Sequence, residues 1–237
     1  MNKNIILIIF GLAIIAYGIY ALTSNKQEEA NISLNSNQDN TYQEQIGENN
    51  NQINQIDNTE PSMVADGSYL VNQEESDVYW QASKVLAGHT GDVTIKSGEF
   101  RIENGELVSG NVTIDMTSIT SDEGIDSLVT HLKSDDFFNV NTYPEANLEI
   151  TNITKLDSST SYEATGNMTI KGITQEITIP LNLEEVGSKV VVNSNFSIDR
   201  TRWEINFRSG KFFQDLGDNM IKDEINFQVR LVGVLNS

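Results

Sequence analysis

Apolar and polar residues alternate through most of the chain after residue 66, in short runs separated by turn-forming pairs such as Ser97-Gly98, Asn104-Gly105 and Gly187-Ser188. A period of two places apolar side chains on one face of a strand and polar side chains on the other. Short strands that recur about every ten residues, with turns between them, are typical of an antiparallel barrel or sandwich with an apolar interior. The expected strands are residues 78–86, 93–96, 99–103, 106–116, 147–155, 162–170, 174–184, 189–198 and 221–234.

One segment follows a helical period instead. Its apolar residues are Ile125, Leu128, Val129 and Leu132. This spacing places them on one face of an α-helix. Thr120 and Glu123 have the spacing of a capping box, which predicts a helix over residues 122–133 that ends before Asp135. We therefore expect an all-β domain with a single inserted helix.

The first part of the chain has a different pattern. Residues 5–22 form a stretch of 18 residues without a charged side chain, and Lys3 precedes it. As a helix this stretch is about 27 Å long, enough to cross the hydrocarbon core of a bilayer. We expect residues 1–22 to be an uncleaved anchor in the cell membrane, with the rest of the chain on the extracytoplasmic (periplasmic or external) side. The alternative is a cleaved signal peptide and a secreted protein, although the best cleavage site, Ile19-Tyr20-Ala21, has a poor residue at its first position.

Residues 23–66 are rich in amides. Asn and Gln make up 16 of these 44 residues, eight are acidic and one is basic. Such a segment buries too little apolar surface to offset its conformational entropy. We expect a disordered tether between the anchor and a folded domain at residues 67–237.

The composition excludes several functions. The chain carries 34 acidic and 15 basic residues, a formal charge of -19, which argues against nucleic acid because a phosphate backbone requires a basic face. The absence of Cys excludes a disulfide, a thiolate metal site and a cysteine nucleophile. The two histidines, His89 and His131, have no metal-ligand spacing, so we expect structural hydrogen bonds from them and neither a metal nor a cofactor.

The interior of the predicted barrel leaves two possibilities open. A barrel of about eight strands is near the size at which side chains either fill the interior or leave room for one small ligand. Alternation names the residues that face inward, but it does not choose between a packed core and a tunnel. If the interior is a tunnel, alternation predicts that its wall contains Trp80, Phe100, Val112, Ile114, Leu148, Ile150, Met168, Ile170, Phe196, Ile198 and Phe227.

Several stretches of the sequence are similar to a known family. They are Gly88-His89-Thr90-Gly91 with residues 94–98, residues 131–140 with Tyr143-Pro144, residues 166–174, and residues 209–218. In this order, between Tyr69 and Leu235, they resemble the YceI family of lipid- and polyisoprenoid-binding, lipocalin-like domains. The sequence departs from the family pattern at Glu204, where many relatives have Gly. This difference affects the geometry of the turn at that position and not the fold.

The resemblance implies an extended eight-stranded antiparallel β-barrel, capped by the helix, with an apolar tunnel for a long-chain amphiphile such as a polyisoprenoid, a quinone or a fatty acyl lipid. It implies neither catalysis nor a cofactor. Each buried CH₂ group contributes about 0.8 kcal/mol, so an apolar tube needs few polar contacts to bind such a chain. Two alternatives stay open: a packed barrel that serves as an adhesion or envelope interaction module, and an enzyme that acts on a lipid through His89 or His131.

Overall fold

The computed structural model describes residues 64–158 and 160–236 of the chain. The predicted membrane anchor, residues 1–22, and all but the last three residues of the predicted tether, residues 23–66, lie outside the described residues. Within the described ranges, no helix has the length and hydropathy of a membrane span.

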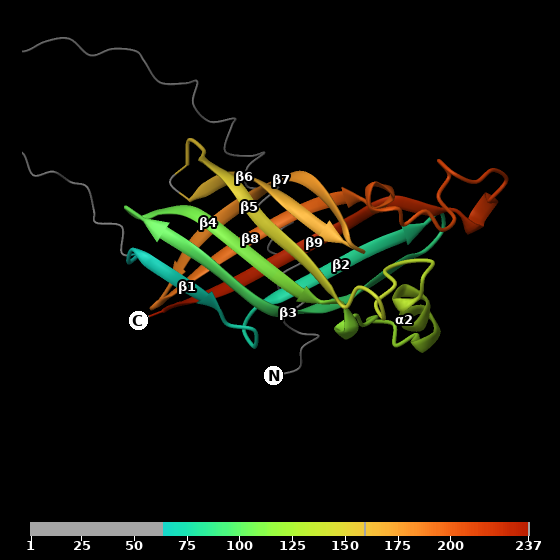
Figure 1. The fold of residues 1–237 in the computed structure, drawn as a ribbon, viewed down its shortest axis with the longest axis horizontal. Helices are drawn as coiled ribbons and strands as arrows, with labels where there is room; N and C mark the ends of the chain where they lie inside the picture. The colour runs from blue at the N-terminus through green and yellow to red at the C-terminus, as the bar shows by residue number, and fades with distance from the viewer. Residues whose placement is uncertain (1–63, 159, 237) are drawn as a thin grey trace, which may run out of the picture. The chain divides into compact units, whose positions relative to one another are not determined.

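The described residues form one antiparallel sheet with short helical segments at one end (Figure 1). The strands are β1 (Gly67–Val71), β2 (Asp77–Lys84), β3 (Gly88–Glu103), β4 (Glu106–Asp115), β5 (Glu145–Lys155), β6 (Ser161–Ile170), β7 (Ile173–Val186), β8 (Lys189–Asp199) and β9 (Ile221–Leu235). The α-helix is α2 (Asp126–Lys133), and the 3₁₀ helices are η2 (Met116–Ser118), η3 (Arg200–Trp203) and η4 (Gly217–Asn219). The all-β class with a single α-helix in the described ranges agrees with the prediction.

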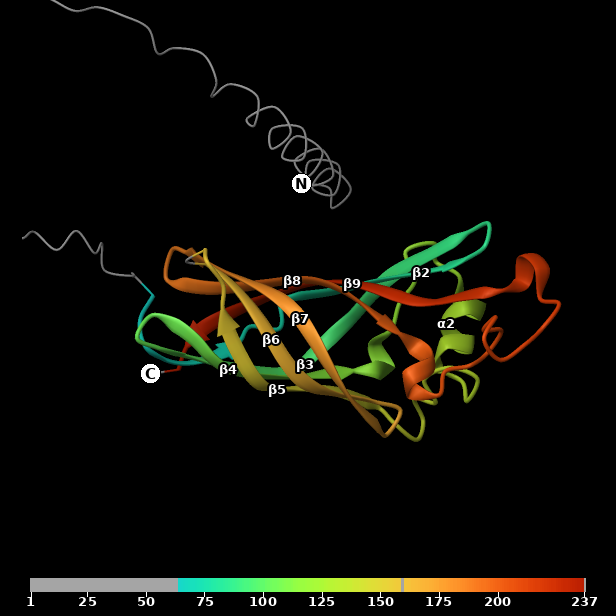
Figure 2. The ribbon, with the colours of Figure 1, turned by 90° about the horizontal axis from the view of Figure 1, so that it is seen from above.

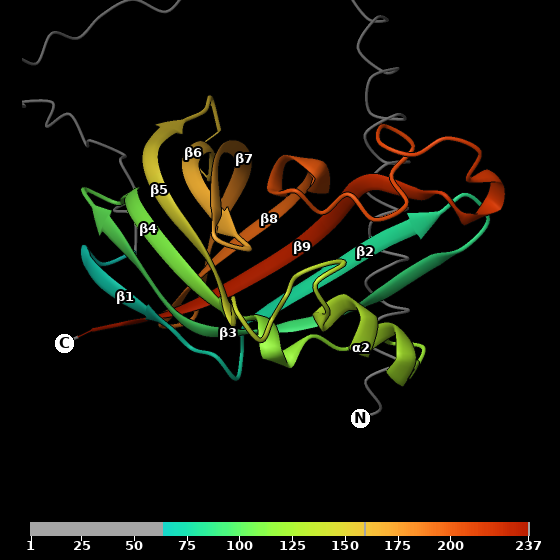
Figure 3. The ribbon, with the colours of Figure 1, turned by 45° about the vertical axis from the view of Figure 1, so that its right-hand side comes forward.

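The nine strands close into a barrel with eight strand positions, as predicted (Figure 3). β1 and β2 share one position, because both pair with β3 and with β9. β2 pairs with the first part of β9, where Trp80 lies opposite Phe227, and β1 pairs with its last part, where Tyr69 lies opposite Leu235. Pairing of β3 with β4 closes the circle. β1 was not predicted from the sequence, because five residues beside a polar segment are too few to establish alternation.

The predicted turn at Ser97-Gly98 is wrong. β3 runs without interruption through this pair, and its register against β4 shifts between Ile95 and Ser97, as at a β-bulge. A Cβ atom on Gly98 would lie 2.8 Å from the Val71 side chain. The glycine therefore marks a bulge and a close approach of β1, which produce the same local sequence signal as a turn.

Two other predicted turns are confirmed. The Asn104-Gly105 pair joins β3 to β4, with φ angles of 53° and 73°, as a type I′ turn requires. The Asp66 carboxylate accepts a hydrogen bond of 2.9 Å from the Gly105 N–H. Gly187-Ser188 joins β7 to β8, with a φ of 64° at the glycine.

The β6–β7 hairpin contains a turn that the sequence analysis did not recognise. Lys171 and Gly172 have φ angles of 53° and 74°. Lysine is uncommon at positive φ, so the pair gives a weak turn signal. A Cβ atom on Gly172 would lie 2.6 Å from the Tyr143 ring, so the glycine also makes room for the segment that precedes β5.

The helix begins later than predicted and without the predicted capping box. Ile125 is the N-cap of α2 and makes no side-chain capping bond. Glu123 instead accepts a hydrogen bond of 3.3 Å from the Thr90 N–H on β3. Gly124, with a φ of 65°, is outside the helical region and prevents an earlier start. The predicted end before Asp135 is confirmed.

η3 follows β8 and contains two large buried side chains, those of Arg200 and Trp203. Trp203 is fully buried, and its indole N–H donates a hydrogen bond of 3.1 Å to the Met168 carbonyl oxygen on β6. The segment ends at Glu204, which adopts a left-handed conformation with a φ of 58°. A left-handed C-cap favours glycine, so Glu204 is a strained residue at this turn.

Candidate functional site

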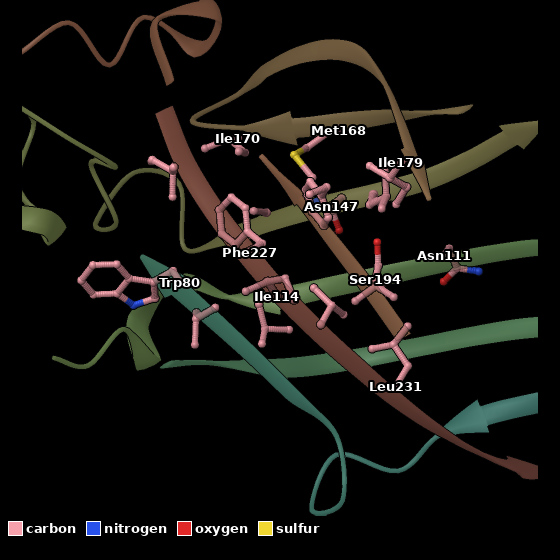
Figure 4. A pocket seen from close by; sticks show the side chains of 18 of the residues that line it. Trp80, Asn111, Ile114, Asn147, Met168, Ile170, Ile179, Ser194, Phe227 and Leu231 are labelled. Atoms are coloured by element: carbon pink, nitrogen blue, oxygen red, sulfur yellow. The ribbon is translucent and has the colours of Figure 1, made fainter. Parts of the chain in front are cut away.

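An apolar cavity of about 200 Å³ lies inside the barrel. Side chains from β2 through β9 contribute to its wall. Figure 4 shows Trp80 near one end, Ile114, Met168 and Phe227 farther along, and Leu231 toward the opposite end. The interior therefore contains free space lined by hydrocarbon, which a packed core would not leave.

Ten of the predicted wall residues line this cavity. They are Trp80, Phe100, Val112, Ile114, Leu148, Ile150, Met168, Ile170, Phe196 and Phe227. Ile198 does not line it, but is buried in the core and lies opposite Ile225 on β9. Contact between any of these side chains and a ligand stays a prediction.

Other residues of the cavity wall were not among those predicted from the sequence. From β7, β8 and β9 these are Ile179, Leu181, Val192, Val229 and Leu231. Alternation places all of them on the inner face, but it carries no information on how far the free space extends along the axis. From the segments between β4 and β5 the unnamed residues are Met116, Ile119, Leu132, Phe137 and Phe138. No strand period could identify these.

α2 lies at one end of the barrel (Figure 2), and apolar side chains are buried at this end. Met116 from η2, Ile119, Leu132 from α2 and Phe137 are all buried. They line the cavity at the same time, so they form its end wall.

β1 lies at the opposite end of the barrel (Figure 1), where apolar side chains are also buried. Tyr69 and Phe100 stack there, with ring centroids 5.3 Å apart and nearly parallel planes. Ile102, Leu107 and Tyr162 are buried around them. Both ends of the cavity are therefore lined mainly by apolar side chains, although the buried Tyr162 hydroxyl has no hydrogen-bond partner within the described residues.

One buried cation, Arg200, belongs to the cavity wall. Its guanidinium donates hydrogen bonds to the carbonyl oxygens of Ile205 (2.5 Å), Lys222 (3.1 Å) and Ile221 (3.1 Å). It also donates one of 3.2 Å to the Asp223 carboxylate. Burial lowers the pKa of Arg200, and the Asp223 charge opposes that shift. The Arg200 guanidinium therefore donates its hydrogen bonds to protein acceptors, and these bonds connect η3 to the start of β9.

The histidines lie outside the cavity wall. The His131 ring packs edge-on against Phe137 and Phe207, with centroids 4.9 and 4.7 Å apart, and its Nε2 lies 2.9 Å from the Asp136 carboxylate. His89 Nδ1 lies 3.7 Å from the Glu123 carboxylate. In residues 64–158 and 160–236, no group of three or more His, Cys, Asp or Glu residues is placed to hold a metal ion.

Comparison with known families matches residues 69–233 to the YceI-like domain. This chain belongs to the YceI family. The match covers the barrel from β1 to β9, with the cavity and its cap. No curated protein matches the chain.

Solved structures share the fold of this YceI-like domain. BcnA of Burkholderia cenocepacia is 23% identical, with a TM-score of 0.58 over 68% of this chain and 98% of that one. A polyisoprenoid binding domain from Saccharophagus degradans, implicated in plant cell wall breakdown, is 14% identical, with a TM-score of 0.54 over 71% and 98%. The Campylobacter jejuni YceI protein is 16% identical, with a TM-score of 0.50 over 88% and 99%. At these identities the likeness concerns the fold.

Proposed function

We propose that this YceI-like protein binds a long-chain amphiphile, namely a polyisoprenoid, a quinone or a fatty acyl lipid, inside the barrel and carries or sequesters it without chemical change. The observation that carries the proposal is the apolar cavity. Each CH₂ group moved from water into such a cavity contributes about 0.8 kcal/mol, so a long tail provides enough affinity by itself. The polyisoprenoid binding domain among the structural relatives supports this choice of ligand class.

The length of the cavity favours a long tail. Its wall residues on β9 run from Ile221 to Leu231. At 3.3 Å per residue and a strand tilt near 40°, this stretch covers about 25 Å of the barrel axis. One leaflet of a bilayer core is about 15 Å thick, so the cavity exceeds the extent of an ordinary acyl chain. A polyprenyl tail uses this length better than a common fatty acid.

The proposed place of action is the outer side of the cell membrane. The support comes from the sequence, with Lys3 before an apolar stretch long enough to span and an amide-rich segment between that stretch and the barrel. A domain held close to a membrane would exchange its lipid with that membrane over a short distance. Membrane fractionation and protease accessibility of the full chain in intact cells test this placement.

Mass spectrometry of organic extracts from the purified full chain tests the binding function. The expected result is an isoprenoid or acyl lipid in the extract. Val229 lines the cavity, and its neighbour Gln228 is exposed on the outer face of β9. Val229→Trp fills the cavity and should remove the lipid, whereas Gln228→Trp should retain it. Extracts without lipid from all three folded proteins would contradict the proposal.

The two alternatives have less support in the structure. A packed barrel would not leave a cavity of about 200 Å³. An enzyme that uses a histidine would place it near the bound tail or head, but neither His89 nor His131 belongs to the cavity wall. Binding without catalysis therefore accounts best for the geometry.

A further inference from the structure

The seam between β4 and β5 is only partly paired. The ladder between the two strands runs from Asp115 opposite Glu145 to Asn111 opposite Glu149 and ends at this second pair. Residues 106–110 of β4 and 150–155 of β5 have no ladder pair between them, although each strand remains paired with its other neighbour. Figures 1 and 3 both show the two strands diverging over this part.

A groove borders the end of this ladder. The groove is on the outside and is lined by residues 109–113 of β4 and 147–150 of β5. Seven of these residues also line the internal cavity, so this short stretch of wall borders both the groove and the cavity. Gly110 belongs to this stretch and has no side chain. A Cβ atom there would lie 3.6 Å from Phe100 and 3.9 Å from Ile150, which leaves normal contact distances.

A bound amphiphile needs a place for its polar head. Mainly apolar side chains are buried at both ends of the cavity, at α2 and at β1. The groove at Gly110 is bordered by the polar residues Ser109, Asn111 and Asn147. Asn147 accepts a hydrogen bond of 2.8 Å from the Thr113 hydroxyl, and its amide N–H groups remain available. The side chains of Ser109 and Asn111 bond to no other protein group in the described ranges.

The charges around the groove are unfavourable for an anionic head group. Glu149 lines the groove, and Glu99 lies opposite Asn111 on β3. Neither carboxylate forms an ion pair within residues 64–158 and 160–236. The cations nearby are already paired, because Lys155 binds Glu106 at 2.8 Å and Arg101 binds Glu103 at 2.7 Å.

We propose that the cavity opens into the β4–β5 groove at Gly110, and that the head of the bound amphiphile lies in this opening and is an uncharged oxygen-bearing group, such as a hydroxyl or a quinone carbonyl. This inference rests on the proposed function. An uncharged oxygen accepts hydrogen bonds from the amide N–H groups of Asn111 and Asn147. A carboxylate or phosphate head would instead face Glu99 and Glu149 without a free cation. The ligand is therefore a neutral prenyl alcohol or quinone rather than a fatty acid or a prenyl phosphate.

Two ligands with the same tail test the head. Geranylgeraniol and geranylgeranyl phosphate are titrated into the delipidated full chain at low ionic strength, with the emission of Trp80 in the cavity wall as the signal. We expect the alcohol to bind at least about tenfold more tightly, a difference of about 1.4 kcal/mol. Equal or tighter binding of the phosphate would overturn the inference and leave the proposed function standing. Failure of both ligands to bind the folded chain would overturn both.

Charge variants identify the residues responsible. Glu99→Gln combined with Glu149→Gln should tighten binding of the phosphate and leave that of the alcohol unchanged. Glu184→Gln is the matched control, because Glu184 is exposed on β7, away from the opening. The inference is wrong if the double variant and the control give the same ratio of affinities.

A second pair of variants tests the passage itself. Gly110→Leu places a side chain in the opening, and Gly110→Ala fits without a close contact. We expect Gly110→Leu to slow dissociation of bound geranylgeraniol at least about tenfold, which corresponds to 1.4 kcal/mol in the barrier. Gly110→Ala should leave the rate unchanged. An unchanged rate in a folded Gly110→Leu protein would show that the ligand enters elsewhere and overturn the inference.

Discussion

Replacement of Arg200 by leucine should destabilise the domain strongly. The change removes a buried guanidinium and leaves the carbonyl oxygens of Ile205, Ile221 and Lys222 and the carboxylate of Asp223 without their donor. Breaking a buried ion pair by removal of one partner costs about 3–5 kcal/mol. Each buried carbonyl left unpaired costs about 1–3 kcal/mol, although these costs do not add in full because the site relaxes. We expect a loss of about 4 kcal/mol in the free energy of unfolding, a large part of the 5–15 kcal/mol typical of a domain.

Urea unfolding, followed by tryptophan emission, measures this loss. Arg202→Leu is the matched control. Arg202 is exposed, donates one hydrogen bond of 2.7 Å to the Glu176 carbonyl oxygen and lies 5.4 Å above the Trp203 ring. An exposed cation of this kind contributes no more than about 1 kcal/mol. Equal losses from the two variants would refute the structural role of Arg200 and leave its charge free to bind an anionic ligand.

Three further changes have defined outcomes. Glu204→Gly should raise the free energy of unfolding by about 0.5–1 kcal/mol in urea, because it relieves a left-handed conformation at a φ of 58°. Gly91→Ala should lower the melting temperature, at a cost of about 1–3 kcal/mol, because its Cβ would lie 2.1 Å from the Thr120 carbonyl oxygen. The Thr117 hydroxyl and N–H lower the pKa of Asp115 from its ordinary 3.8, so the carboxylate stabilises the fold above the unfolded-state pKa and ceases to do so as the pH falls through the lower folded-state value. Wild type should therefore be more stable than Asp115→Asn at neutral pH, and urea titrations should show this advantage decrease as the pH falls below 3.8 and disappear below the folded-state pKa.

The barrel was predictable because one face of each strand is buried. That constraint imposes a period of two, and it located eight of the nine strands to within a few residues or in part. Glycine was the main source of error, because the same residue serves different purposes. Gly105 makes a turn, and Gly98 allows the close approach of β1 at a bulge. Gly172 makes a turn and also allows the close approach of Tyr143. Only the tertiary neighbours distinguish these cases.

The inner face of the cavity was predictable, but its extent was not. Ile198 and Ile179 both face inward by alternation, yet Ile179 lines the free space and Ile198 belongs to the packed core. Where space remains depends on how side chains from several strands meet across the axis. The partial pairing of β4 with β5 left no signal in the sequence, because each strand has an ordinary alternating pattern. The extent of a ladder depends on how the two strands meet in the fold.

A crystal structure of the full chain, purified without added lipid, tests the central claim most directly. The account predicts one elongated stretch of electron density along the barrel axis, between Trp80 and Leu231, that continues into the opening at Gly110. Side chains that meet across the axis, with neither density nor free space between them, would contradict it.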